Sequence, residues 1–109
     1  MRSHRDEASV LAKVKELLNE GGRLGLRVTN VTGMPDMIGC VNGRFVGVEV
    51  KDDVNGSYKL TKAQKIRLAQ VRKAGGYGWA VDRAGLEPFA DMLDRLENGE
   101  ELPRKWGYV

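Results

Sequence analysis

The sequence predicts an α/β domain with a mixed central β-sheet flanked by helices. Apolar residues recur at helical spacing in three segments, short apolar runs typical of strands lie between them, and an Asn-Gly pair marks a tight turn between two of these runs. The predicted elements follow one another as helix, three strands, helix, strand and helix (αβββαβα). A chain of 109 residues has the length of a single domain with one modest core.

The composition limits the classes of function. The formal net charge of +3 is a mild positive excess that suits a polyanionic partner such as a nucleic acid. No apolar run approaches the ~18 residues of a membrane-spanning helix, and no secretory segment follows Met1, so we expect no membrane partner and a cytoplasmic location. The single cysteine, Cys40, cannot form an internal disulfide and is expected to be a small, buried core residue.

The first predicted helix runs from Ser3 to Glu20 and ends at two glycines. Its apolar residues recur at every third or fourth position, and they are Val10, Leu11, Val14, Leu17 and Leu18. Ser3 and Asp6 would form a capping box at its start. Glu7 continues the apolar stripe by one turn, which is an unusual place for a carboxylate. Its ordinary explanation is a favourable contact with the helix dipole.

A first strand is predicted from Leu24 to Val31, followed by a loop that extends to Met34. Pro35 has no N–H to donate to a β-ladder, so it belongs at the start of the second strand. That position directs the next residue, Asp36, toward the charged residues of the following hairpin.

The second and third strands are predicted to form a β-hairpin around Asn42 and Gly43. Both residue types tolerate the positive φ that a two-residue type I′ turn requires. With this turn, Val41 pairs with Arg44, and the position numbers of all opposite residues have the same sum. The turn therefore fixes the register of the whole hairpin.

This register places three charged side chains on one face of the hairpin. Asp36 lies opposite Glu49, with Cβ atoms about 4.5–5.5 Å apart, and Lys51 shares their face. Two such carboxylates repel each other unless a cation lies between them. Mg²⁺ is usually held by one or two carboxylates with water and phosphate, and a nearby amine can orient or deprotonate a bound water. The ordinary alternative is a cross-strand salt bridge, although apolar residues on both faces predict that the sheet is covered on both sides.

The segment after the hairpin is predicted to form a polar loop and a second helix. The loop spans Asp52 to Lys59 and the helix Thr61 to Ala74, in which Thr61 and Gln64 form a capping-box pattern. This region is basic, and its cationic residues are Lys59, Lys62, Lys65, Arg67, Arg72 and Lys73. These cations form either a solvated helix face or a surface that contacts phosphates.

A fourth strand from Tyr77 to Asp82 and a third helix from Leu86 to Glu97 complete the predicted domain. The helix carries an apolar stripe formed by Phe89, Met92, Leu93 and Leu96. The tail contains Trp106 and Tyr108, which require an apolar surface, either in the same core or on a second subunit.

The chain resembles the virus-type replication-repair nuclease (VRR-NUC) family of the PD-(D/E)xK superfamily, most closely its small stand-alone members from bacteriophages. The resemblance extends from the first helix to about Val81, and its motifs are Gly33-Met34-Pro35-Asp36, Gly43-Arg44-Phe45, Glu49-Val50-Lys51, Leu60-Thr61-Lys62-Ala63-Gln64 and Gly75-Gly76. It implies a restriction-endonuclease-like fold and hydrolysis of DNA phosphodiester bonds that depends on Mg²⁺, with Mn²⁺ as a possible substitute.

The resemblance also implies roles for individual residues. Asp36, Glu49 and the backbone carbonyl of Val50 would bind the metal, and Lys51 would orient or deprotonate the attacking water. Gln64 would support the lysine or the scissile phosphate in addition to capping its helix.

Glu7 would be the first-helix acid of this family, which completes the outer shell of the metal or binds a second ion. Its spacing to the following helix residues departs from the family's pattern, so the helix-dipole explanation stays open.

The expected assembly is a homodimer that cleaves four-way (Holliday) junctions. One metal cluster cuts one strand, so coordinated cleavage of two strands requires two sites, most simply related by a two-fold axis. The third helix and the aromatic tail would supply the interface. The alternatives are a flap-cutting or restriction-type nuclease and a non-catalytic nucleic-acid-binding protein of the same fold, although a binding protein has no need to gather acids near phosphates.

Overall fold

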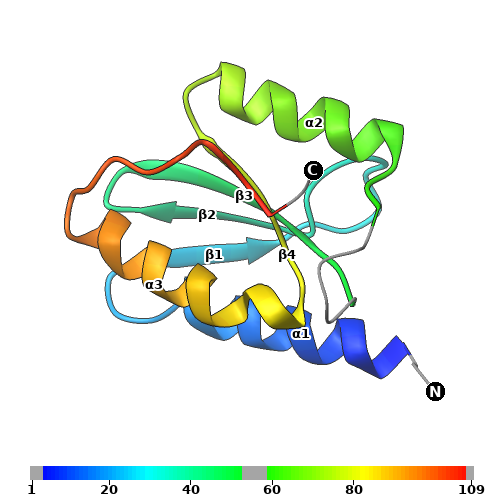
Figure 1. Cartoon of the computed structure of the whole chain (residues 1–109), viewed down its shortest axis with the longest axis horizontal. Coiled ribbons are helices and arrows are strands. Elements are labelled where there is room, and N and C mark those ends of the chain that lie inside the picture. Colours follow the sequence, from blue (N-terminus) through cyan, green and yellow to red (C-terminus); the bar gives the residue numbers. More distant parts are fainter. Residues whose placement is uncertain (1–3, 53–58, 108–109) are drawn as a thin grey trace.

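A five-stranded mixed sheet lies between helices in the computed structural model, which describes residues 4–52 and 59–107 (Figure 1). The elements are α1 (His4–Leu18), β1 (Leu24–Arg27), β2 (Met37–Val41), β3 (Arg44–Val50), α2 (Lys62–Lys73), β4 (Tyr77–Val81), the 3₁₀-helix η1 (Arg83–Gly85), α3 (Leu86–Glu97) and β5 (Lys105–Trp106). Helices α1 and α3 cover one face of the sheet and α2 covers the other (Figure 1). The predicted α/β class and the mixed sheet are confirmed.

The strands lie in the order β1-β2-β3-β4-β5. The first three are antiparallel neighbours, whereas β3, β4 and β5 pair in parallel. Helix α2 is the crossover between β3 and β4, and α3 connects β4 to β5. Strand β5 was not predicted, because two residues are too short to show a periodic pattern.

The predicted hairpin is confirmed in its turn and its register. Val41 pairs with Arg44, and Asn42 and Gly43 have φ angles of 50° and 78°. Strand β1 is shorter than predicted and ends at Arg27. The predicted capping box at Ser3 lies outside the described residues, as does most of the polar loop that follows β3.

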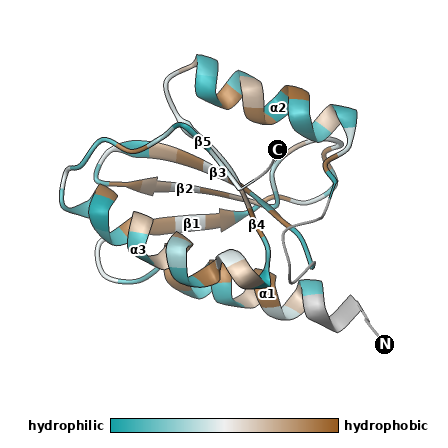
Figure 2. Ribbon diagram, in the orientation of Figure 1, coloured by the Kyte–Doolittle hydropathy of each residue, from teal (hydrophilic) through white to brown (hydrophobic). Residues whose placement is uncertain are grey.

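The core lies between the sheet and the pair α1 and α3. Its members include Val10, Val14, Leu18, Val46, Val48, Trp79, Phe89, Leu93 and Leu96, all of which are fully buried. Hydrophilic residues concentrate on the helices and loops (Figure 2). In the described part of the chain, no helix is both long and apolar enough for a membrane crossing.

The third helix and the described part of the tail pack onto this core, the first of the two surfaces predicted for the tail, and the interface predicted for them stays a prediction. Trp79 makes edge contacts with Phe89 and Trp106, with ring centroids 6.1 and 6.3 Å apart. The indole of Trp79 also donates a hydrogen bond to the carbonyl of Pro103 at 3.1 Å. The apolar stripe of α3 is buried within the same chain, and Tyr108 lies outside the described residues.

The face of the sheet beneath α2 is only partly covered, which corrects two predictions. Helix α2 packs over β3 and β4, where a Cβ on Gly78 would lie 2.8 Å from the carbonyl oxygen of Leu68. Over β1 and β2 the same face is open, so Cys40 is exposed rather than buried. Sequence pattern identifies which residues share a face, but it does not show how far a helix extends across that face.

Candidate active site

Asp36 and Glu49 lie at the end of the hairpin that is farthest from its turn, on the α2 face of the sheet. Gly47, two residues before Glu49, lets Pro35 approach closely, since a Cβ there would lie 3.2 Å from Pro35 Cγ. Pro35 is buried in this contact. The packing fixes the chain immediately before Asp36.

Asp36 is held by both neighbouring strands. Its carboxylate oxygen Oδ2 accepts a hydrogen bond from the Val50 N–H at 2.7 Å, and its backbone carbonyl accepts one from the Val28 N–H at 2.9 Å. The second carboxylate oxygen, Oδ1, lies 3.8 Å from Nη1 of Arg27. The carboxyl group is thereby fixed at the end of β3, beside Glu49.

Glu49 is 4% exposed. Its Oε2 accepts a hydrogen bond from Nε2 of Gln64 at 2.9 Å, whereas Oε1 is buried and has no hydrogen-bond partner among the described residues. Burial, and then the nearby carboxylate of Asp36, raise the pKa of Glu49 from 4.5 to about 9, against a smaller opposing effect of Lys51. Without a cation the carboxyl group is therefore protonated at neutral pH.

Lys51 is joined to this pair through Gln64. The lysine Nζ donates to Oε1 of Gln64 at 3.1 Å, and the same oxygen accepts from the Thr61 N–H at 2.8 Å. The backbone N–H of Gln64 donates to Thr61 Oγ1 at 3.1 Å, which completes the predicted capping box. Gln64 thus caps α2 and also connects Lys51 to Glu49.

Glu7 lies at the edge of this cluster. It is exposed on α1, and its negative charge makes a small contribution to the raised pKa of Glu49. In residues 4–52 and 59–107, no group of three or more His, Cys, Asp or Glu side chains could hold a metal ion. Glu7 therefore lies within electrostatic range of Glu49, and its role as a metal ligand stays a prediction.

The donor set fits a hard divalent cation. A buried, unpartnered carboxylate oxygen on Glu49 is costly unless a proton or a cation neutralises the group. Two carboxylates with an adjacent backbone carbonyl match the way Mg²⁺ is held, since the remaining positions go to water and substrate phosphate. Val50 lies directly between Glu49 and Lys51 at the end of β3, next to the Asp36 carboxylate.

Arg27 belongs to the same neighbourhood and was not identified from the sequence. It is the last residue of β1 and pairs with Met37, the residue after Asp36. Its position depends on the register between β1 and β2, and the loop that joins these strands is too long for a turn signal to fix that register. The available signal was one arginine within the strand predicted from Leu24 to Val31, which is weak alone.

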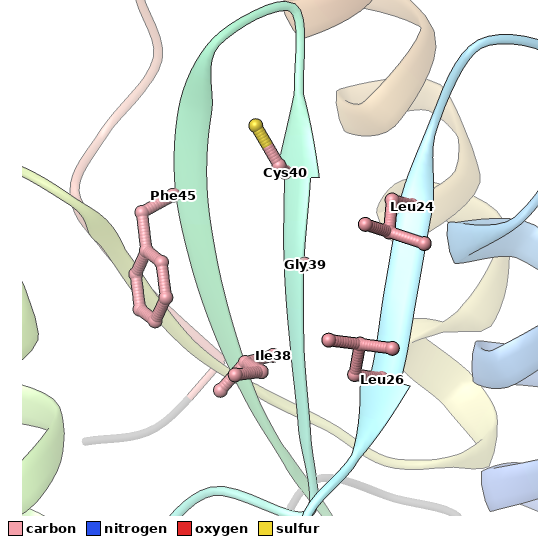
Figure 3. Close-up of a pocket in the computed structure, with 6 residues that line it drawn as sticks. All are labelled: Leu24, Leu26, Ile38, Gly39, Cys40 and Phe45. Carbon is pink, nitrogen blue, oxygen red and sulfur yellow. The ribbon is translucent and has the colours of Figure 1, made fainter.

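An uncharged patch of the sheet lies on the same face as the candidate site. We call it the open face, and it consists of Leu24, Leu26, Ile38, Cys40 and Phe45 (Figure 3). These side chains border a shallow cavity of about 170 Å³ with an entirely apolar lining. Leu24, Leu26 and Phe45 are each about half exposed.

The two sides of the molecule differ in charge. Helix α2 carries five basic residues and no acidic one, whereas α3 carries four acidic residues and one arginine. Because α2 covers the face of the sheet that bears the candidate site, the basic surface and the site belong to the same side of the molecule.

No protein-family model matches the chain, and no curated protein or solved structure is significantly similar to it. The function of the chain is therefore inferred from the geometry of the site and from the motifs of the sequence.

Proposed function

We propose that this protein is a metal-dependent DNA endonuclease of the PD-(D/E)xK type with a restriction-endonuclease-like fold. The observation that carries the proposal is the convergence of Asp36, Glu49, Lys51 and Gln64 around a buried carboxylate oxygen with no hydrogen-bond partner among the described residues. A purely structural ion-pair cluster would satisfy such an oxygen, whereas a cation site requires it to be available.

The metal ligands would be Asp36, Glu49 and the carbonyl of Val50, with Mg²⁺ as the ion and Mn²⁺ as a substitute. When bound, the ion would neutralise charge on the scissile phosphate and lower the pKa of a bound water. Glu49 must lose its proton to the solvent before it can act as a ligand. Glu7 would act only in the outer shell.

Lys51 would position the attacking water. Its Nζ is held by Gln64 and lies close enough to Glu49 to lower the pKa of that carboxyl group. An amine anchored in this way can donate a hydrogen bond to a water near the carboxylates, or take its proton. Gln64 holds the lysine and Glu49 in a fixed relation to each other.

DNA would lie across the α2 side. The cations of α2 would contact backbone phosphates, and such contacts give affinity without sequence preference. The acidic surface of α3, on the opposite side of the sheet, would repel the same phosphates.

The substrate would be branched DNA, cut by a homodimer acting as a four-way-junction resolvase. The open face is the surface that suits a second copy. A two-fold contact places each patch against itself. Two copies joined through α2 would bring ten cations together, whereas the open face carries no charge. This surface replaces the interface expected from α3 and the tail.

The proposal is tested by incubating the protein with end-labelled duplex, flap and four-way-junction DNA in Mg²⁺ or in EDTA. Cleavage of the junction in Mg²⁺ alone supports the full proposal. Cleavage restricted to flaps by a monomer favours the flap-nuclease alternative. Tight binding to DNA without cleavage in Mg²⁺ or Mn²⁺ favours the non-catalytic alternative.

A further inference from the structure

We propose that Arg27 binds a DNA phosphate beside the candidate metal site, an inference that rests on the proposed nuclease function. The guanidinium group is anchored through one nitrogen. Nη1 donates hydrogen bonds to the carbonyl oxygens of Val28 and of Asp36, the latter at 2.9 Å. These two bonds use both N–H groups of Nη1 and fix the orientation of the planar group.

The opposite edge of the guanidinium remains available. Nε and Nη2 carry three N–H groups that have no hydrogen-bond partner in the described part of the chain, and the side chain is 39% exposed. The Nε–Nη2 edge presents two parallel donors, the geometry that binds two oxygens of one phosphate.

The positive charge of Arg27 has one loose ion pair, with Asp36. Its nearest carboxylate oxygen, Asp36 Oδ1, lies 3.8 Å from Nη1, beyond the roughly 2.7–2.9 Å of a charge-assisted hydrogen bond. Arg23 shows the contrast within the same chain. Its side chain is 3% exposed, and it bonds to Asp94, Glu97 and the carbonyl of Leu17, as a structural arginine does.

The position of Arg27 selects the ligand. Nη1 faces Asp36, so a phosphate on the free edge would be separated from Asp36 and the proposed cation by the width of the guanidinium group, within reach of the same DNA strand that is to be cut. An isolated carboxylate ligand would also fit the edge, but the net charge of +3 favours a polyanion that passes the end of β1, the edge strand of the sheet.

The test measures DNA affinity without metal. Fluorescence anisotropy in EDTA would give the dissociation constant of a labelled four-way junction for the wild type, Arg27→Lys, Arg27→Gln and the control Arg95→Lys on α3. We expect Arg27→Lys to bind about 10-fold more weakly, because it loses the two parallel donors of the guanidinium. The slope of the logarithm of the dissociation constant against the logarithm of salt concentration should not change, because lysine keeps the charge. Arg27→Gln should in addition reduce the slope by about 1. Arg95→Lys should bind as the wild type does.

A role confined to anchoring the Val28–Asp36 loop gives a different result. Thermal unfolding temperatures of the Arg27 variants would then fall while their DNA affinities stay at the wild-type value, and this outcome overturns the inference. If the wild type cleaves DNA but Arg27→Gln binds normally, only the inference fails. If the wild type binds but does not cleave, and Arg27→Gln binds weakly, the phosphate site stands and the nuclease proposal fails. A wild type that does not bind DNA overturns both.

Discussion

Glu49 is buried beside a second carboxylate, and this arrangement links the stability of the protein to pH. The folded state holds the proton of Glu49 with a pKa of about 9, compared with 4.5 in the unfolded chain. The stability that this proton contributes is therefore fully present below about pH 4.5 and is lost as the pH rises to about 9. A site that gathers acids for a cation is least stable at alkaline pH when no cation is present.

Replacing Glu49 by Gln should remove this dependence. The amide of the new side chain mimics the protonated acid, since its nitrogen can donate to Asp36 and its oxygen can still accept from Gln64. Urea unfolding at pH 6 and pH 9 without metal should show that Glu49→Gln gains stability over the wild type as the pH rises. If the free energies of unfolding of the two proteins differ by the same amount at both pH values, Glu49 does not have the raised pKa that its burial beside Asp36 implies.

Replacing Lys51 should affect turnover, whereas replacing Lys65 should affect DNA binding. Lys51 is anchored to Gln64 within the site, so Lys51→Ala should reduce kcat by ~10²–10⁴ and leave DNA affinity nearly unchanged. Lys65 is exposed on α2, so Lys65→Ala should weaken DNA binding modestly and leave kcat intact. Single-turnover kinetics and anisotropy on the same junction would compare the two variants. The reverse pattern would make Lys51 a phosphate contact.

At the scale of elements, the hairpin could be predicted from local sequence. The Asn42-Gly43 turn fixes the pairing of β2 with β3, and that pairing alone brings Asp36, Glu49 and Lys51 together. The capping box of α2 is equally local, and it places Gln64 at the start of the helix that packs over the site.

The parts that could not be predicted depend on contacts between distant elements. Arg27 reaches the site only because β1 pairs with β2 in one particular register. Cys40 is exposed because α2 packs over β3 and β4, where Gly78, in register with Gly47, allows its close approach. Neither relation leaves a periodic pattern in the sequence.

At the scale of the whole molecule, two copies should associate through the open face. Leu26 is 52% exposed there, so Leu26→Glu should leave the fold intact but place like charges against each other across the two-fold axis. Light scattering at micromolar concentration should show a dimer for the wild type and a monomer for this variant. Ile66→Glu, which alters an exposed apolar residue on α2, is the matched control and should remain dimeric. A monomeric wild type would overturn the proposed assembly and favour cleavage of flaps.

The most direct test of the proposed function is Mg²⁺-dependent cleavage by a variant that lacks one carboxylate of the site. Asp36→Ala removes the carboxylate beside Glu49. The control Asp91→Ala removes an exposed carboxylate from α3. In a junction-cleavage assay with saturating Mg²⁺, we expect activity to be lost, by at least ~10²-fold, in Asp36→Ala and retained in Asp91→Ala, with both proteins folded by circular dichroism. Cleavage by folded Asp36→Ala at the wild-type rate would contradict the assignment of the Asp36–Glu49 pair as the metal site.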